Sequence, residues 1–210
     1  LHVNIMEIAK VFRSKPYKTG IALSGGGIKG LCHAGVLKAL EEVGIKPDII
    51  SGVSAGAIVG ALYADGYTPD EIATLFEDIS FRQMTKFRIP DGGLFRIDAF
   101  EEFMLKNLRA KTFEALKIPL RIVATNLDKG TSVVFDKGNL INPIIASCSV
   151  PVLFTPKKID GVNYVDGGVL KNFPVSTIHN DCDKVIGINA SPLVADDYKL
   201  SLMNVASRTY

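Results

Sequence analysis

Two glycine-rich turns, each directly after a short apolar run, constrain the fold of this chain more than any other feature. Residues 52–56 read Gly-Val-Ser-Ala-Gly and separate an apolar run from a segment of small residues. This order of strand, sharp turn and helix is the context of a nucleophile elbow, which lifts the hydroxyl of Ser54 out of the sheet edge. Residues 25–27 are three glycines placed in the same way after an earlier apolar run. Two such turns at neighbouring strand ends can supply a nucleophile and an oxyanion hole.

The rest of the chain alternates between strand and helix patterns. Apolar runs and period-two stretches predict strands, and apolar residues spaced three or four apart predict helices. This alternation indicates an α/β layered fold with a largely parallel sheet. The predicted strands are 21–24, 48–52, 119–126, 131–135, 163–165 and 184–190, and the predicted helices are 31–43, 57–64, 69–79, 98–108 and 142–149.

Bulk composition favours one globular domain over residues 1–210, because the chain is 47% hydrophobic and has no low-complexity linker. A net charge of +2, with basic residues scattered along the chain, gives no nucleic-acid footprint. Residues 49–64 are uncharged and carry glycines at a membrane-dimer spacing, but spanning takes roughly 18 or more apolar residues, so no transmembrane segment is predicted. The cysteines are odd in number and lack C-x-x-C spacing, which indicates no disulfide framework, no metal site and a reducing, cytoplasmic location: Cys32, Cys148 and Cys182.

The first glycine turn allows two functional interpretations. Gly25, Gly27 and Gly30 match the dinucleotide fingerprint G-x-G-x-x-G, but Asp48 stands at the start of the next strand rather than at its end, where a ribose-binding carboxylate belongs. A nucleotide site is therefore the weaker interpretation. The alternative is a set of backbone N–H donors near a helix start, where the helix dipole favours negative charge. Lys29 could add positive charge there or simply be solvated.

A serine nucleophile needs a base, and the sequence offers few. Of the three histidines, His2 lies in the terminal segment and His33 in the helix after the glycine turn, while His179 falls in a polar stretch typical of a surface residue. Asp166 ends a short strand and precedes two glycines that would present its carboxylate at a turn. A carboxylate bonded to the serine hydroxyl can act as base if burial compensates for its low intrinsic pKa.

These motifs, taken in order, resemble the patatin-like phospholipase family. The resemblance extends to residues 30–37, 146–156 and 172–174 and covers roughly residues 18–190. Two departures are Lys29, where the family usually has Arg, and Ser24, at a position where the family varies. The motifs are Gly25-Gly26-Gly27-Ile28-Lys29-Gly30, Gly52-Val53-Ser54-Ala55-Gly56 and Asp166-Gly167-Gly168.

The resemblance implies a three-layer α/β/α sandwich, as in patatins and acyl-carrier transacylases. It implies Ser54 as nucleophile and Asp166 as base of a dyad without histidine, with Gly25, Gly26 and Gly27 forming the oxyanion hole. The implied substrate is a lipid or fatty-acyl ester, cleaved through an acyl-serine intermediate without metal or cofactor. Supporting roles fall to Lys29, Gly30, Gly52, Gly56, Gly167 and Gly168.

Several alternatives stay open at this level. A transacylase would use the same site, and a non-catalytic acyl- or nucleotide-binding module would leave Ser54 unreactive. Residues 80–95 combine aromatic and basic side chains that suit a lid or a transient, peripheral membrane contact, although packing in a core loop explains them equally well. Whether the natural chain continues past Tyr210 is also open.

Overall fold

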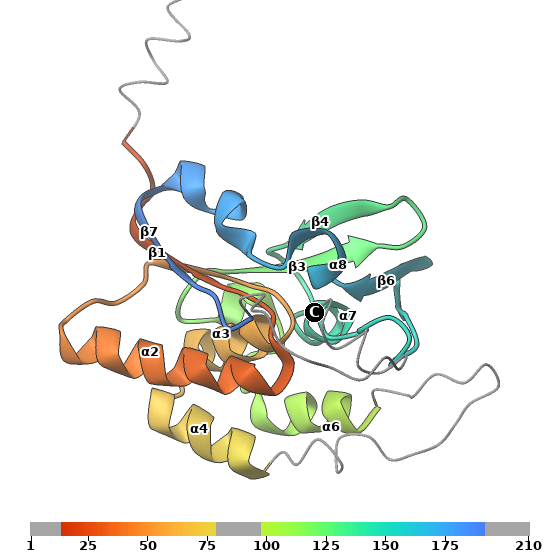
Figure 1. Cartoon of the computed structure of the whole chain (residues 1–210), viewed down its shortest axis with the longest axis horizontal. Helices are drawn as coiled ribbons and strands as arrows, with labels where there is room; N and C mark the ends of the chain where they lie inside the picture. Colours follow the sequence, from red (N-terminus) through yellow and green to blue (C-terminus); the bar gives the residue numbers. More distant parts are fainter. Residues whose placement is uncertain (1–13, 79–97, 192–210) are drawn as a thin grey trace, which may run out of the picture.

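A seven-stranded sheet forms the centre of the protein in a computed structural model that describes residues 14–78 and 98–191 (Figure 1). The strand order is β5-β6-β3-β2-β1-β7, with β4 also paired to β3. The strands are β1 (Tyr17–Leu23), β2 (Ile49–Gly52), β3 (Leu120–Asn126), β4 (Thr131–Phe135), β5 (Lys157–Ile159), β6 (Val162–Asp166) and β7 (Cys182–Ile188).

The sheet combines a parallel part with an antiparallel part. β7, β1, β2 and β3 run parallel to one another, whereas β4 and β6 pair antiparallel with β3, and β5 pairs antiparallel with β6. Among the parallel strands β2 is buried along its whole length, because both of its faces are covered. The predicted α/β class and the hairpin joining 119–126 to 131–135 are thus confirmed.

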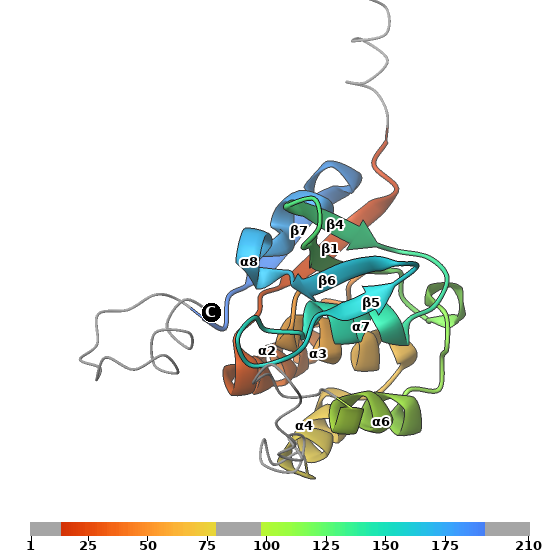
Figure 2. The same cartoon turned by 90° about the vertical axis from the view of Figure 1, so that its right-hand side faces the viewer.

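Helices cover the two faces of the sheet unequally (Figures 1 and 2). On one face α3 contacts β2 and β3 and α7 contacts β3, and α2, α4 and α6 form a further layer beside them. The other face is covered by α8 and short 3-10 turns. The helices are α2 (Cys32–Glu42), α3 (Ala55–Asp65), α4 (Pro69–Asp78), α6 (Asp98–Asn107), α7 (Ile141–Ser147) and α8 (Gly168–Lys171), with 3-10 turns η1 (Gly27–Leu31), η2 (Phe113–Ala115), η3 (Pro174–Thr177) and η4 (His179–Asp181).

The core lies mainly between the sheet and α3. Every residue of α3 is buried, and the small side chains of this helix allow close packing, with Gly60 lying against Ile50 and Leu120. A much smaller cluster lies on the opposite face, where Ile178 and Cys182 pack on β1 and β2. The helix that follows Ser54 is therefore among the most deeply fixed elements of the molecule.

The structure differs from the predicted elements at the start of β1, at the start of α2 and in two short elements. β1 begins at Tyr17, earlier than expected, because its first residues pair with β7 while their side chains are only partly buried. The helix expected over 31–43 opens as the 3-10 turn η1. The short β5 and α8 were not expected.

The segment 80–95 lies outside the described residues. Within the described ranges, no helix is long and apolar enough to span a bilayer.

Candidate active site

Ser54 occupies a sharp turn between β2 and α3. The strand ends at Gly52, the helix begins at Ala55, and Ser54 is the N-cap residue with φ 52° and ψ −121°. Such backbone angles are costly for a non-glycine residue, and strain of this kind gathers at functional sites. The strand–turn–helix context predicted from residues 52–56 is present.

The glycines around Ser54 are required by close backbone approach. A Cβ on Gly52 would collide with the backbone of Gly56, and one on Gly56 would collide with the carbonyl groups of Leu23 and Ser24. A Cβ on Gly30 would overlap the Ala55 side chain, so the glycine loop packs directly on the elbow. The chain can bring β1, β2 and α3 this close only where side chains are absent.

Asp166 lies on the far side of β3 from Ser54. In the sheet register Gly52 pairs with Ile122 and Asp166 pairs with Ala124, so Asp166 lies at the same edge of the sheet as the end of β2 that leads into Ser54. Asp166 is fully buried. Its Oδ1 accepts the Gly168 N–H at 2.7 Å. A Cβ on Gly167 would collide with the β3 backbone, so this glycine allows the tight turn that follows the aspartate.

The electrostatics of Asp166 suit a base. Burial raises the pKa of Asp166 to about 7, while the Ser54 hydroxyl and the Gly168 N–H each lower it by a smaller amount. Oδ2 of Asp166 is buried and has no hydrogen-bond partner of acceptable geometry among the described residues. The Ser54 hydroxyl lies near enough to Asp166 to lower the pKa of its carboxyl group.

Ser147 is a site residue that the sequence did not single out. Its hydroxyl donates to the Val123 carbonyl at 2.7 Å and accepts the Ser54 backbone N–H at 2.8 Å. It thus ties the strained elbow to β3. The available signal was a serine inside an apolar helical stretch, where a buried hydroxyl needs partners.

The glycine loop lies over Ser54, but its N–H groups are not equivalent. A Cβ placed on Gly25 would lie 3.3 Å from the Ser54 Cβ. The Gly25 N–H donates to the Asn172 carbonyl at 3.1 Å, so it is occupied. Among the described residues, the N–H groups of Gly26 and Gly27 meet no acceptor. Two of the three predicted oxyanion donors are therefore available.

Lys29 and the histidines are the remaining candidates. Lys29 is exposed. His179 is exposed on η4, before β7, and thus at the edge of the sheet opposite to Ser54. His33 is buried and lies 2.9 Å from the Ser24 carbonyl oxygen through Nε2, which makes it a support of the glycine loop rather than a base. No three metal-ligating side chains gather within the described part of the chain.

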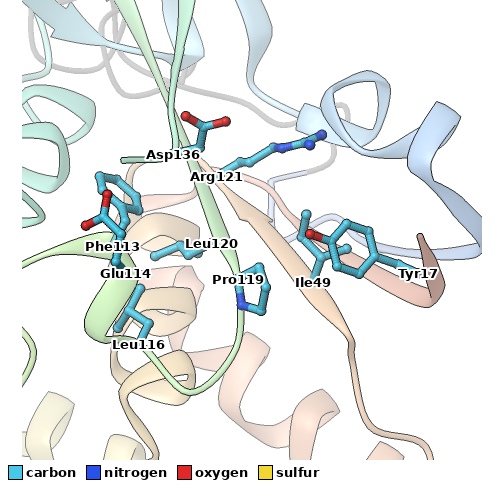
Figure 3. Close-up of a pocket in the computed structure, with 9 residues that line it drawn as sticks. All are labelled: Tyr17, Ile49, Phe113, Glu114, Leu116, Pro119, Leu120, Arg121 and Asp136. Atoms are coloured by element: carbon cyan, nitrogen blue, oxygen red, sulfur yellow. The ribbon is translucent and has the colours of Figure 1, made fainter. Parts of the chain in front are cut away.

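A shallow hollow of about 260 Å³ lies at the amino ends of β1, β2 and β3 (Figure 3). This is the edge of the sheet away from Ser54 and Asp166. The chemistry, and not this hollow, marks the candidate site, because the strained serine and the buried aspartate are both at the other edge. The hollow is lined by Tyr17, Ile49, Phe113, Glu114, Leu116, Pro119, Leu120, Arg121 and Asp136.

The α/β sheet thus carries a strained serine at a strand–helix turn, a buried aspartate and a glycine loop at the same edge. Comparison with known sequences gives the family: the patatin-like phospholipase model matches residues 21–178, and the chain belongs to this family. Membership supports a lipid hydrolase.

Named relatives agree with this placement. The chain is 32% identical to YqhO of Bacillus subtilis, a match that covers 86% of this chain and 74% of that protein. It is 31% identical to the lysophospholipase NTE1 of Kluyveromyces lactis over 80% of this chain, and 30% identical to the neuropathy target esterase sws of Drosophila melanogaster over 77%. The chain matches only 12% of the length of each of these two proteins.

A solved structure gives the same fold. VipD from Legionella pneumophila superposes with a TM-score of 0.57 at 19% identity, covering 77% of this chain and 47% of VipD. At this level of identity the likeness concerns the fold alone. It agrees with the expected layered α/β architecture.

Proposed function

We propose that the protein hydrolyses lipid carboxylic esters, with Ser54 as nucleophile and Asp166 as its base. The observation that carries the proposal is the pairing of a strained serine at the end of β2 with a fully buried aspartate whose pKa is raised to about 7. A base with a pKa near the operating pH combines adequate ionisation with useful basicity. An ordinary surface aspartate would be a far weaker base.

In the acylation step the Ser54 Oγ attacks the ester carbonyl carbon while its proton passes to Asp166. The carbonyl π electrons move to the oxygen, which becomes an oxyanion. The N–H groups of Gly26 and Gly27 are the available donors for this charge, and the start of α3 adds a favourable dipole. Collapse expels the alcohol, which takes the proton from Asp166.

The acyl-serine is then hydrolysed by the reverse arrangement. Asp166 removes a proton from water as the water oxygen attacks the acyl carbon, and it returns a proton to Ser54 Oγ when the fatty acid leaves. An alcohol in place of water would give acyl transfer instead. The same residues serve both outcomes, so product analysis with an added alcohol separates hydrolase from transacylase.

Exposed apolar residues near the reacting groups support a lipid substrate. Ile28 follows the glycine loop and is 78% exposed, while Val169 and Leu170 follow Asp166 and are about half exposed. Such side chains suit contact with acyl chains or a lipid surface more than with small polar esters. A peripheral encounter with a membrane surface follows from the proposal.

The first experiment compares three proteins with a fluorophosphonate probe, read as added mass on the intact chain. Wild type should gain one phosphonyl group and Ser54→Ala none. Ser51→Ala is the matched control, because Ser51 is a buried serine of β2, three residues before Ser54, whose hydroxyl bonds Thr177 instead of the site. It should label like wild type. Equal labelling of Ser54→Ala, or no labelling together with no ester hydrolysis by wild type, would contradict the proposal.

The substrate is then defined with two series. p-Nitrophenyl esters of increasing acyl length test the preference for fatty acyl groups, and lysophospholipid and diacyl phospholipid vesicles test the head group. We expect kcat/KM to rise with chain length. A preference for acetate over long acyl esters would argue against a lipid substrate while leaving the nucleophile in place.

A further inference from the structure

The peptide that joins Ser24 to Gly25 is held at both ends. His33 Nε2 lies 2.9 Å from the Ser24 carbonyl oxygen, and the Gly25 N–H donates to the Asn172 carbonyl at 3.1 Å. A carbonyl oxygen only accepts, so Nε2 of His33 carries the proton. Burial lowers the pKa of His33, which keeps the ring neutral. The base of the glycine loop is therefore fixed in orientation.

The next peptide, between Gly25 and Gly26, is held by the side chain of Ser24. Its hydroxyl donates to the Gly25 carbonyl at 2.8 Å and accepts the Ala190 N–H at 2.8 Å, and Ser24 is fully buried. In a trans peptide the carbonyl and the N–H point in opposite directions. With its carbonyl turned inward to Ser24, this peptide turns the Gly26 N–H toward the outer, half-buried side of the loop.

The third peptide repeats this pattern with a backbone partner. The Lys29 N–H donates to the Gly26 carbonyl at 3.1 Å, which turns the Gly27 N–H away from η1. The Gly26 and Gly27 N–H groups, which meet no acceptor among the described residues, thus belong to peptides whose carbonyl groups accept hydrogen bonds on the opposite side. Of the two peptides that carry these N–H groups, only the Gly25–Gly26 peptide is held by a side chain.

We propose that Ser24 is a positioning residue of the oxyanion hole, whose hydroxyl orients the Gly25–Gly26 peptide so that the Gly26 N–H faces the reacting carbonyl. The inference rests on the proposed ester hydrolysis at Ser54. Glycines on both sides let this peptide rotate easily. Without the Ser24 hydroxyl, a rotated peptide would turn the Gly25 carbonyl oxygen toward the developing negative charge.

The size of the effect follows from the value of one oxyanion donor. Loss of such a donor lowers kcat about 10²- to 10³-fold. Because Ser24→Ala loosens the donor without deleting it, we expect a fall in kcat of about 10- to 100-fold with KM nearly unchanged. Ser24→Thr retains the hydroxyl and should recover most of the wild-type rate.

The deciding readout is an inhibitor that forms the oxyanion. With a long-chain alkyl trifluoromethyl ketone, Ser54 Oγ bonds to the carbonyl carbon, the π electrons move to oxygen and the serine proton passes to Asp166. Ser24→Ala should weaken this inhibitor by the same factor as kcat. The matching alkyl alcohol, which binds only through its chain, should keep its affinity. Ser51→Ala, which also loses a buried serine hydroxyl, should change neither.

The outcomes separate this inference from the proposed function. If wild type hydrolyses the ester and Ser54→Ala does not, but Ser24→Ala keeps wild-type kcat and inhibitor affinity, Ser24 has no positioning role and the proposed function stands. Equal weakening of ketone and alcohol would also overturn the inference, since that indicates general damage. Absence of turnover by folded wild type overturns both. If Ser24→Ala does not fold, Ser24→Cys, with a similar shape and a weak donor, makes the same comparison.

Discussion

The two edges of the central strands contrast sharply. At the carboxyl edge Ser54 holds strained backbone angles, and Oδ2 of Asp166 is buried with no hydrogen-bond partner in the part of the chain that the structure describes. At the amino edge a shallow hollow is present, and two of its charged side chains have partners: Arg121 pairs with Asp181 at 2.7 Å and Glu114 accepts the Gly138 N–H at 2.9 Å. The carboxyl edge therefore keeps backbone strain and a buried polar atom without a partner among the described residues, whereas the paired charges at the amino edge contribute to stability.

This difference shows how to locate a site when shape alone misleads. A hollow needs only imperfect packing at the surface, whereas a strained serine beside an unsatisfied buried charge persists only if the surrounding structure enforces it. The enforcement is visible in the close contacts of Gly52 and Gly56 and in the Ser147 hydroxyl. The following predictions test whether function and stability divide between the two edges.

The largest effect is expected for Asp166→Asn. The amide keeps the shape of the side chain and the oxygen that accepts the Gly168 N–H, but it cannot take a proton. Since general-base catalysis contributes about 10²- to 10⁴-fold, we expect kcat/KM to fall about 10³-fold. The measurement is ester hydrolysis. Asp136→Asn, at the amino-edge hollow, is the matched control and should retain wild-type activity; equal losses in both variants would erase the contrast between the edges.

The pH dependence of the rate should report the raised pKa of Asp166, which is about 7. The base must be ionised, so kcat/KM should rise with pH through about 7, and at pH 5 it should be about a hundredfold below its plateau. A profile already flat at pH 5 would mean that the base ionises at an ordinary aspartate pKa. The measurement is kcat/KM for a p-nitrophenyl ester, with pH-independent detection.

The same raised pKa predicts how stability changes with pH. Between pH 4 and 7 the unfolded chain gives up the Asp166 proton while the folded protein keeps it, so the free energy of unfolding falls as pH rises and levels off above 7. The loss from this one group is about 4 kcal/mol. Urea unfolding of wild type and Asp166→Asn over this range should show the fall only in wild type. Parallel curves for the two proteins would show that folding does not raise the pKa of Asp166.

A smaller effect is expected for Ser147→Ala. The variant removes the acceptor for the Ser54 N–H and the donor to Val123, so the elbow loses one of its fixed points. We expect kcat to fall about tenfold and stability to fall about 1–3 kcal/mol, because a buried N–H loses its partner. Kinetics and thermal unfolding measure the two. Ser149→Ala, which loses a buried hydroxyl bonded only within its own turn, serves as control for stability; an unchanged kcat in Ser147→Ala would remove Ser147 from the site.

The smallest effect is expected at the amino edge. Arg121→Gln breaks a partly exposed ion pair with Asp181 and should lower the free energy of unfolding by about 1 kcal/mol. Its kcat/KM should match wild type, because Arg121 lies at the opposite end of β3 from Ser54 and Asp166. A large loss of activity with preserved stability would show that the hollow communicates with Ser54.

Local sequence patterns determined much of the molecule. The strands flanking both glycine turns, the helix after Ser54 and the hairpin of β3 with β4 all follow from apolar runs and turn residues that lie side by side in the chain. Short elements escaped, because β5 and α8 have only three and four residues and carry no period of their own. The placement of Asp166 as a base remains a prediction that the variants above test.

The sequence by itself determined which residues could react: a serine between two glycines, a glycine loop and an aspartate before two more glycines. Only the tertiary structure decided their state. It places Ser147, 93 residues away, against the Ser54 N–H; it gives the Gly25 N–H to Asn172; and it buries Asp166 until its pKa is about 7. These properties depend on contacts between distant segments and on exclusion of water, and neither is encoded in the spacing of neighbouring residues.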